Sequence, residues 1–164
     1  MPTPSKPSAS YTTVATPIGE LTLVASETAL TEVHFPRRFG RGSQVPRGDN
    51  AILARAAAQL ADYFAGNRTS FDLPLDMGGT DFEQRVWSLL REIPFGATLS
   101  YGDLARRLGT PKDARAVGAA NGKNPIPIIV PCHRVIGANG DLTGFGGGLE
   151  TKRWLLVHEG ALLV

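Results

Sequence analysis

The sequence predicts an α+β fold in which a small α/β domain precedes a mostly helical domain. Alternating apolar and polar residues, typical of strands, fill the first part of residues 11–79 and precede one helical pattern. Residues 80–164 carry several helical patterns separated by glycine and proline. The 164-residue chain is long enough for two small domains. We therefore expect a scaffold domain at 11–79, a second domain at 80–164, and a disordered Pro/Ser-rich tail at 1–10.

The first domain is expected to contain three strands and one helix. YTTVATPIGELTLVAS alternates on both sides of Pro17–Gly19, which predicts a hairpin, and ALTEVHF predicts a third strand. Residues 36–50 are rich in Gly, Pro and Arg and predict a loop. A helix should follow and end at Gly66. Its buried face is predicted to comprise Ile52, Ala56, Leu60 and Phe64. FDLPLD, interrupted by Pro74, should be an edge strand or a linker.

The second domain is expected to begin with a helix at TDFEQRVWSLLREIP. Thr80 and Glu83 have the spacing of a capping box, and Pro94 follows the helix end. The predicted buried stripe comprises Phe82, Val86, Leu89, Leu90 and Ile93. We interpret Trp87 as a core or interface residue.

Two short helices in succession predict a helix-turn-helix. Ser100 should cap YGDLARRL, Gly109 should end that helix, and Thr110 should cap a second helix that stops at Gly122. The second helix is nearly bare of large side chains, with Lys112 and Arg115 as its long polar residues. Its small residues are Ala114, Ala116, Gly118, Ala119 and Ala120. They permit either close helix packing or entry into a DNA minor groove, which is only about 6 Å wide.

Positive charge is concentrated in this region. Residues 1–79 carry seven basic and seven acidic side chains, whereas residues 101–134 carry six basic and two acidic side chains, a net charge of +4. Such an excess suits a phosphate backbone, to which helix amides starting at Thr110 could also bind. The alternative is a solvated surface with scattered arginines.

The composition argues against several classes of protein. No segment reaches the roughly 18 apolar residues of a membrane span, and the N-terminus lacks the apolar core of a signal peptide. A single cysteine cannot form an internal disulfide, which favours a reducing cytoplasm or nucleoid. With one Cys and three His, we expect no metal site, and no cofactor motif is present.

Cys132 is the candidate reactive residue. His133 and Arg134 could stabilise its thiolate, and the prolines of NPIPIIVPC stiffen the chain before it. Asn124 and Glu159 are polar partners that folding could bring near. The alternative is that the cysteine is a small buried apolar residue. The glycine-rich segment GANGDLTGFGGGLE, residues 137–150, predicts a loop, and ETKRWLLVHEG predicts a last helix that ends near residue 160.

These segments resemble a known family. PCHRVIG, preceded by NPIPIIV and followed by GFGGGLETKRWLLVHEG, resembles the active-site signature of the O6-alkylguanine-DNA alkyltransferases. The resemblance runs from about Thr80 to Gly160 and includes SYGDLARRLG and ARAVGAANGKNPIP; in residues 1–79 it depends mainly on TPIGELTLVAS. It implies an RNase H-like N-terminal domain and a winged-helix-like C-terminal domain that contacts the minor groove of double-stranded DNA as a monomer.

The resemblance also implies roles for individual residues in the transfer. Cys132 matches the nucleophile that accepts the alkyl group, and His133 matches the base that deprotonates it through a water. Glu159 matches the carboxylate that orients the histidine. Tyr101 matches the phenol that protonates or hydrogen-bonds the departing guanine, and Asn124 matches the residue that braces the active-site turn.

Further residues match positions that contact DNA or the substrate. Arg115 matches the arginine that occupies the space left by a flipped nucleotide. Gly102, Thr110 and Ala138 fall where relatives contact the DNA backbone. Phe145 and Gly146 lie in the alkyl pocket region, where many relatives have Tyr and some have Ser.

The expected function is therefore stoichiometric, irreversible repair of O6-alkylguanine in DNA, with activity on O4-alkylthymine left open. Two rivals remain. A small cysteine hydrolase would use Cys132, His133 and Glu159 but leaves the bare helix without a purpose. A DNA-binding module without chemistry, such as an alkyl-lesion sensor, would need no nucleophile.

Overall fold

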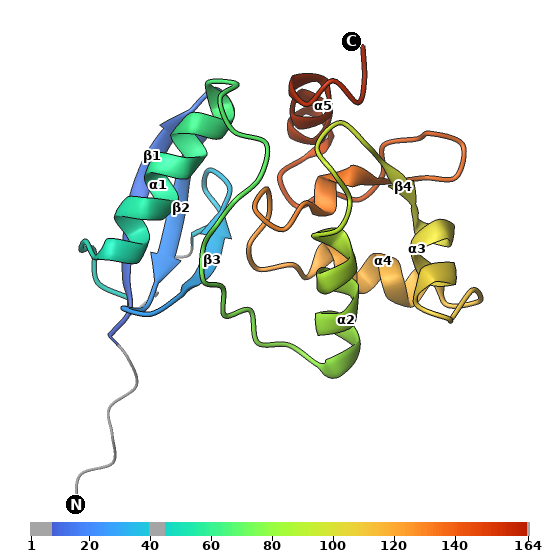
Figure 1. The fold of residues 1–164 in the computed structure, drawn as a ribbon, viewed down its shortest axis with the longest axis horizontal. Coiled ribbons are helices and arrows are strands. Elements are labelled where there is room, and N and C mark those ends of the chain that lie inside the picture. The colour runs from blue at the N-terminus through green and yellow to red at the C-terminus, as the bar shows by residue number, and fades with distance from the viewer. Residues whose placement is uncertain (1–7, 40–44, 164) are drawn as a thin grey trace, which may run out of the picture. The chain divides into compact units, whose positions relative to one another are not determined.

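The computed structural model describes residues 8–39 and 45–163 and divides the chain into two compact units, 1–77 and 78–164 (Figure 1). The first holds a small sheet and one helix and the second is mostly helical, so the predicted fold class is confirmed. Most of the tail predicted at 1–10 lies outside the described residues, but Ser10 already belongs to the first strand. The strand reaches this far because Ser10 pairs with Ala25.

The sheet of the first unit is antiparallel, with strand order β1-β2-β3. Its strands are β1 (Ser10–Thr16), β2 (Gly19–Ala25) and β3 (Leu30–His34). Thr16 pairs with Gly19, which leaves a two-residue turn and confirms the predicted hairpin. Gly19 has φ +105°, a conformation that side chains other than glycine rarely adopt.

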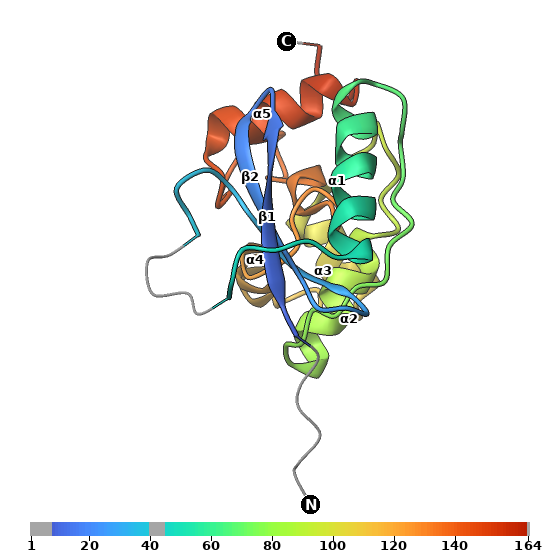
Figure 2. The ribbon, with the colours of Figure 1, turned by 90° about the vertical axis from the view of Figure 1, so that its left-hand side faces the viewer.

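Helix α1 (Ala51–Phe64) packs on this sheet, as Figures 1 and 2 show. Asn50 caps it, since its side chain accepts a hydrogen bond of 2.8 Å from the Leu53 amide. The predicted face is wrong at its end: Phe64 is only half-buried and Tyr63 is fully buried. Residues four apart drift by about 40° per step around a helix, so the fourth member of the series leaves the face.

The remaining described residues of the unit form loops. Residue 11 makes an isolated bridge with Arg47. FDLPLD forms no strand and behaves as a linker that makes one isolated bridge, between Leu75 and Leu30.

The second unit begins with α2 (Asp81–Leu90), whose predicted capping box between Thr80 and Glu83 is present. Val86, Trp87, Leu90 and Ile93 are buried, whereas Phe82 and Leu89, predicted in the same stripe, are only half-buried. The buried face thus centres on Trp87, whose indole Nε1–H donates to the Ala120 carbonyl at 2.9 Å. Of the two interpretations of Trp87, core or interface, the structure supports the core.

Helices α3 (Tyr101–Arg107) and α4 (Ala114–Gly122) pack against each other and confirm the predicted helix pair. Ser100 caps α3, and Gly109 follows it with φ +80°. The predicted cap at Thr110 is wrong, because α4 begins after Asp113. The Thr110 amide donates to the Ala105 carbonyl, and its own carbonyl accepts from the Asp113 amide. Thr110 thus closes the end of α3 and starts a turn.

Short elements complete the unit. Strand β4 (Leu99–Ser100) pairs in parallel with β5 (Val135–Ile136), which directly follows the 3-10 helix η1 (Cys132–Arg134). Helix α5 (Leu149–His158) is last and packs against η1. None of the helices in the described residues is long and apolar enough to cross a membrane.

Candidate active site

The chain approaches the cysteine through a braced turn. The Asn124 side chain donates to the Val130 carbonyl at 2.7 Å and accepts from the Ile126 amide at 2.9 Å. Between these two anchors, Ile128 has φ +73°, which is unfavourable for a β-branched residue. Ile128 is only 1% exposed. Packing and the Asn124 hydrogen bonds therefore hold the backbone in a strained form just before the cysteine.

Cys132 opens the 3-10 turn and is 6% exposed, so the sulfur is almost completely removed from water. Burial raises the pKa of the thiol to about 11. A hydrogen bond from the Asn124 side chain and the positive charge of Lys152 act in the opposite direction and favour the thiolate. The Asn121 side chain donates to the Cys132 carbonyl at 3.3 Å and ties the turn to α4. At rest, the thiol is therefore protonated.

His133, Glu159 and Arg134 form a buried network behind the cysteine. His133 Nε2 lies 2.8 Å from Glu159 Oε2. Arg134 donates to both carboxylate oxygens, at 2.7 and 3.0 Å, and to the Ile93 carbonyl at 2.6 Å. The histidine and the glutamate are 0% exposed through their side chains. Glu159 follows the last residue of α5. It thus binds both His133 and Arg134, which precede it in the sequence by 26 and 25 residues.

This network leaves His133 neutral and with one free ring nitrogen. Burial lowers the pKa of His133, although the hydrogen bond to Glu159 opposes that effect. Nδ1 is buried and has no hydrogen-bond partner in the described part of the chain. Because Glu159 holds Nε2, Nδ1 is the atom that can accept a proton.

Tyr101 joins the site from the first residue of α3. Its hydroxyl donates to the Thr143 carbonyl at 3.3 Å, in the glycine-rich segment. A Cβ atom at Gly118 of α4 would lie 3.7 Å from the Tyr101 ring, so α4 lies directly against the tyrosine. The small residues of α4 therefore permit close packing on one side of the helix. Close packing was one of the two interpretations of these residues, and entry into a DNA minor groove was the other.

Lys152 was not predicted from the sequence. Its side chain is 0% exposed, and its Nζ donates to the Val135 carbonyl at 2.6 Å and the Thr143 carbonyl at 2.8 Å. Nζ also lies 6.0 Å from the centre of the Tyr101 ring. Burial lowers its pKa to about 8, although the charge of Cys132 raises it. Within ETKRWLLVHEG it resembles an ordinary surface lysine. No local sequence signal marks it, because the carbonyls that bind it belong to other segments.

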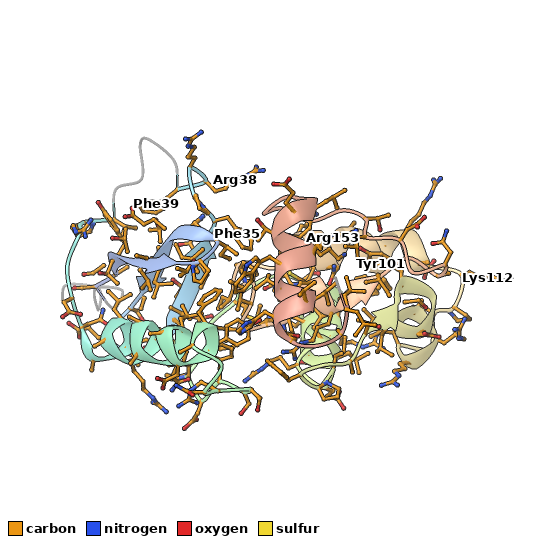
Figure 3. All side chains as sticks on the ribbon, turned by 90° about the horizontal axis from the view of Figure 1, so that it is seen from above. Phe35, Arg38, Phe39, Tyr101, Lys112 and Arg153 are labelled. Atoms are coloured by element: carbon orange, nitrogen blue, oxygen red, sulfur yellow. The ribbon has the colours of Figure 1, made fainter. Side chains whose placement is uncertain are left out.

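The residues expected to contact DNA are exposed or half-buried. Arg115 is exposed in the first turn of α4, and Ala116 and Ala119 share its exposed side. Figure 3 shows Lys112 at the outer end of the unit, in the turn before α4. Of the other three positions, one lies in the first turn of α3 and two lie in loops. They are Gly102 and Thr110, both half-buried, and Ala138, which is exposed.

Phe145 and Gly146 lie in the glycine-rich segment between β5 and α5, half-buried and exposed respectively. The Phe145 carbonyl accepts from the Gly148 amide at 3.0 Å, which closes a turn directly before α5. Across residues 8–39 and 45–163, no group of three or more His, Cys, Asp and Glu side chains is arranged to hold a metal ion.

The site combines a buried thiol with an imidazole–carboxylate pair, and a helix-turn-helix adjoins it. These features define a class of protein that uses a reactive cysteine beside a candidate DNA-binding helix. The family models agree with this class. Residues 81–161 match the DNA binding domain of 6-O-methylguanine DNA methyltransferase, and residues 10–77 match its ribonuclease-like domain. The chain belongs to this family.

Relatives are similar along nearly the whole chain. The methylated-DNA–protein-cysteine methyltransferase of Mycobacterium bovis is 52% identical over 91% of this chain and 91% of its own length. The protein of that name from Methanosarcina acetivorans is 46% identical, over 92% of this chain and 98% of its own. A Mycobacterium tuberculosis OGT structure in complex with DNA has a TM-score of 0.85 and 52% identity, covering 92% of both chains.

Proposed function

We propose that this chain repairs O6-alkylguanine in double-stranded DNA by moving the alkyl group to Cys132, once per molecule. Repair of DNA by transfer of an alkyl group to a cysteine of the protein is the reaction of its family, and the chain has a single cysteine. The observation that carries the proposal is the position of that cysteine. It opens a braced turn whose next residue, His133, is bonded to Glu159 at 2.8 Å.

Transfer requires a base for the thiol, a nucleophilic sulfur and a proton for the departing guanine. His133 Nδ1 takes the thiol proton, directly or through a water, and Glu159 stabilises the charge that appears on the imidazole. The sulfur then attacks the alkyl carbon, and the bond from that carbon to guanine O6 breaks. Its electron pair stays on the guanine. Tyr101 donates a hydrogen bond to the leaving base, which takes one proton from Tyr101 or from water, and the proton held by His133 replaces it.

Arg115 and α4 supply the DNA contact in this proposal. The alkyl carbon lies inside a stacked duplex, so the nucleotide must be extruded at a cost of a few kcal/mol. The exposed Arg115 can fill the vacated space. The small Ala116 and Ala119 beside it let the helix enter the minor groove. Gly102, Thr110 and Ala138 would contact the backbone, and Phe145 and Gly146 would line the alkyl pocket.

A thioether has no good leaving group, and none of the groups placed around Cys132 would cleave it. We therefore propose a single turnover, which separates this function from a cysteine hydrolase. The presence of a thiol at Cys132 distinguishes the proposed function from that of a lesion sensor, which needs no nucleophile. We further propose a monomer that works in the cytoplasm on the nucleoid, since a reducing compartment keeps the thiol free.

The test is transfer from a duplex that contains one O6-methylguanine with a labelled methyl group. The parent chain should take up the label, whereas Cys132→Ala should take up none and still bind the duplex. Uptake by Cys132→Ala would overturn the proposal. Continued turnover of an ester substrate by the parent would favour the hydrolase instead.

A further inference from the structure

We infer that Lys152 is the electrostatic partner of the Cys132 thiolate: its buried ammonium group stabilises the sulfur anion while the alkyl group is transferred. The inference builds on the proposed function, because it assumes that Cys132 reacts as a thiolate. It assigns a task to a residue that the transfer chemistry described above does not use.

The first support is the burial of a cation without a carboxylate. Lys152 is 0% exposed, and in the described part of the chain its hydrogen-bond acceptors are the carbonyls of Val135 and Thr143. Glu159, the nearby buried acid, is already bonded to His133 and Arg134. A buried charge that lacks a counter-ion is costly. That cost falls when Cys132 ionises, because the thiolate is an anion whose charge interacts with Lys152.

The second support is position. Lys152 holds the carbonyl of Val135, three residues after the cysteine, and the carbonyl of Thr143, to which the Tyr101 hydroxyl also donates. Its ammonium thus lies between the strand that leaves the cysteine turn and the tyrosine proposed to assist the leaving base. Two acceptors also leave one of its three N–H groups uncommitted.

The polar groups of the candidate site have separate tasks in this scheme. From the thiol's own turn, His133 takes the proton and Arg134 neutralises Glu159, which comes from the end of α5. Tyr101 comes from α3. Lys152 alone combines a formal positive charge with an electrostatic interaction that favours the thiolate. Burial keeps the thiol protonated at rest, and Lys152 limits how unfavourable its ionisation becomes.

Two substitutions separate charge from hydrogen bonding. Lys152→Gln keeps an N–H donor for the two carbonyls but removes the charge, and Lys152→Arg keeps the charge. The control is Arg153→Gln, which removes a charge from the neighbouring exposed position of α5. Each chain is tested for methyl transfer from the duplex and for reaction of Cys132 with iodoacetamide between pH 6 and 10.

At pH 7.5, Lys152→Gln should react about tenfold more slowly in both assays, since the charge of Lys152 lowers the pKa of the thiol and a nearby opposite charge typically changes a pKa by about one unit or more. The deficit should shrink above about pH 8, because Lys152 of the parent then loses the charge that the variant lacks at every pH. Lys152→Arg should recover most of the rate, and Arg153→Gln should match the parent. Equal rates in the parent and Lys152→Gln, or a deficit that is the same at every pH, would overturn the inference.

The parent alone provides a second test if the variants fail to fold. The logarithm of its iodoacetamide rate should rise by one for each pH unit up to about pH 8, the pKa of Lys152, and more slowly above it. The slope falls because each new thiolate then appears with a lysine that is losing its charge. A constant slope to pH 9.5 would overturn the inference. If labelled methyl never reached Cys132, the proposed function would fail instead, which is a separate result.

Discussion

The two units bury different kinds of polar side chain. Among the described residues of the first unit these are Thr22 and Gln59, neither of them ionisable, and Gln59 is satisfied by two hydrogen bonds of 2.9 Å to the backbone of Asp72. Among its described residues, the second unit buries Asn121, the Cys132 thiol and four further ionisable residues: His133, Arg134, Lys152 and Glu159. Buried ions seldom increase stability compared with a well-packed apolar core.

The chain gives up stability in the unit that holds the candidate site. The first unit uses its interior for packing, with Leu21, Leu23 and Leu60 all 0% exposed. The second unit surrounds one thiol with charges that each need a partner. Substitutions in the first unit should therefore change stability alone, whereas substitutions in the buried network of the second should change stability and transfer together.

The largest effect is expected for Glu159→Gln. This change leaves the buried Arg134 without its counter-ion and weakens the partner of His133 Nε2, so the second unit should lose about 3–5 kcal/mol of stability. Transfer should also slow at temperatures where the variant is still folded. Urea unfolding followed by tryptophan fluorescence reports this unit, since both tryptophans, Trp87 and Trp154, belong to it. Glu92→Gln, on the surface, is the control. Equal losses in the two variants would contradict the account.

Next in size is Arg115→Ala, which should separate DNA handling from thiol chemistry. Without the side chain that fills the vacated stack, transfer from duplex DNA should slow about tenfold or more, because extrusion costs a few kcal/mol. Reaction of Cys132 with iodoacetamide should be unchanged, since Arg115 is exposed on α4. Arg91→Ala, an exposed change after α2, controls for lost charge. Equal slowing of both reactions would mean that Arg115 supports the site itself.

A smaller effect follows from the pKa of Lys152, about 8 in the folded chain against an ordinary 10.5. Between these values the unfolded chain binds more protons, so stability should rise with pH from 8. The thiol, raised from 9.0 to about 11, acts in the opposite sense above pH 9. From pH 8 to 9, chemical denaturation should therefore show the parent gaining stability relative to Lys152→Gln. A parallel pH dependence of the two chains would contradict this.

The smallest effect is expected for Asn50→Ala in the first unit. Loss of the cap on α1 should cost about 1 kcal/mol, and the transfer rate should not change. Backbone circular dichroism should detect the destabilisation, whereas tryptophan fluorescence at low denaturant should not. Thr80→Ala removes the matching cap in the second unit and should alter the fluorescence transition. A clear loss of transfer in Asn50→Ala would show that the first unit does more than support the fold.

Features encoded by neighbouring residues could be predicted from the sequence. The hairpin around residues 17–18 and the capping box of Thr80 and Glu83 depend on contacts within a few positions, and both are present. The pairing of His133 with Glu159 could be anticipated only from the family resemblance, because 26 residues separate them. Thr110 looked like a cap because Pro111 follows it, but its amide is committed to Ala105.

Features that depend on distant backbone could not be predicted. Nothing local marks Ile128 for positive φ; the Asn124 hydrogen bonds on either side and the surrounding core impose it. Lys152 is buried only because the carbonyls of residues 135 and 143 converge on its ammonium. Helical periodicity indicates which side of a helix is apolar. It does not indicate that a cation on that helix binds carbonyl groups of distant segments.

Intact-mass spectrometry of the parent, mixed with an excess of duplex that contains O6-methylguanine, tests the central claim most directly. The account predicts a gain of one methyl group per chain, located in the peptide that contains Cys132, and no further gain with time or added duplex. A methyl group on another residue, or lesion loss that exceeds the amount of protein, would contradict it.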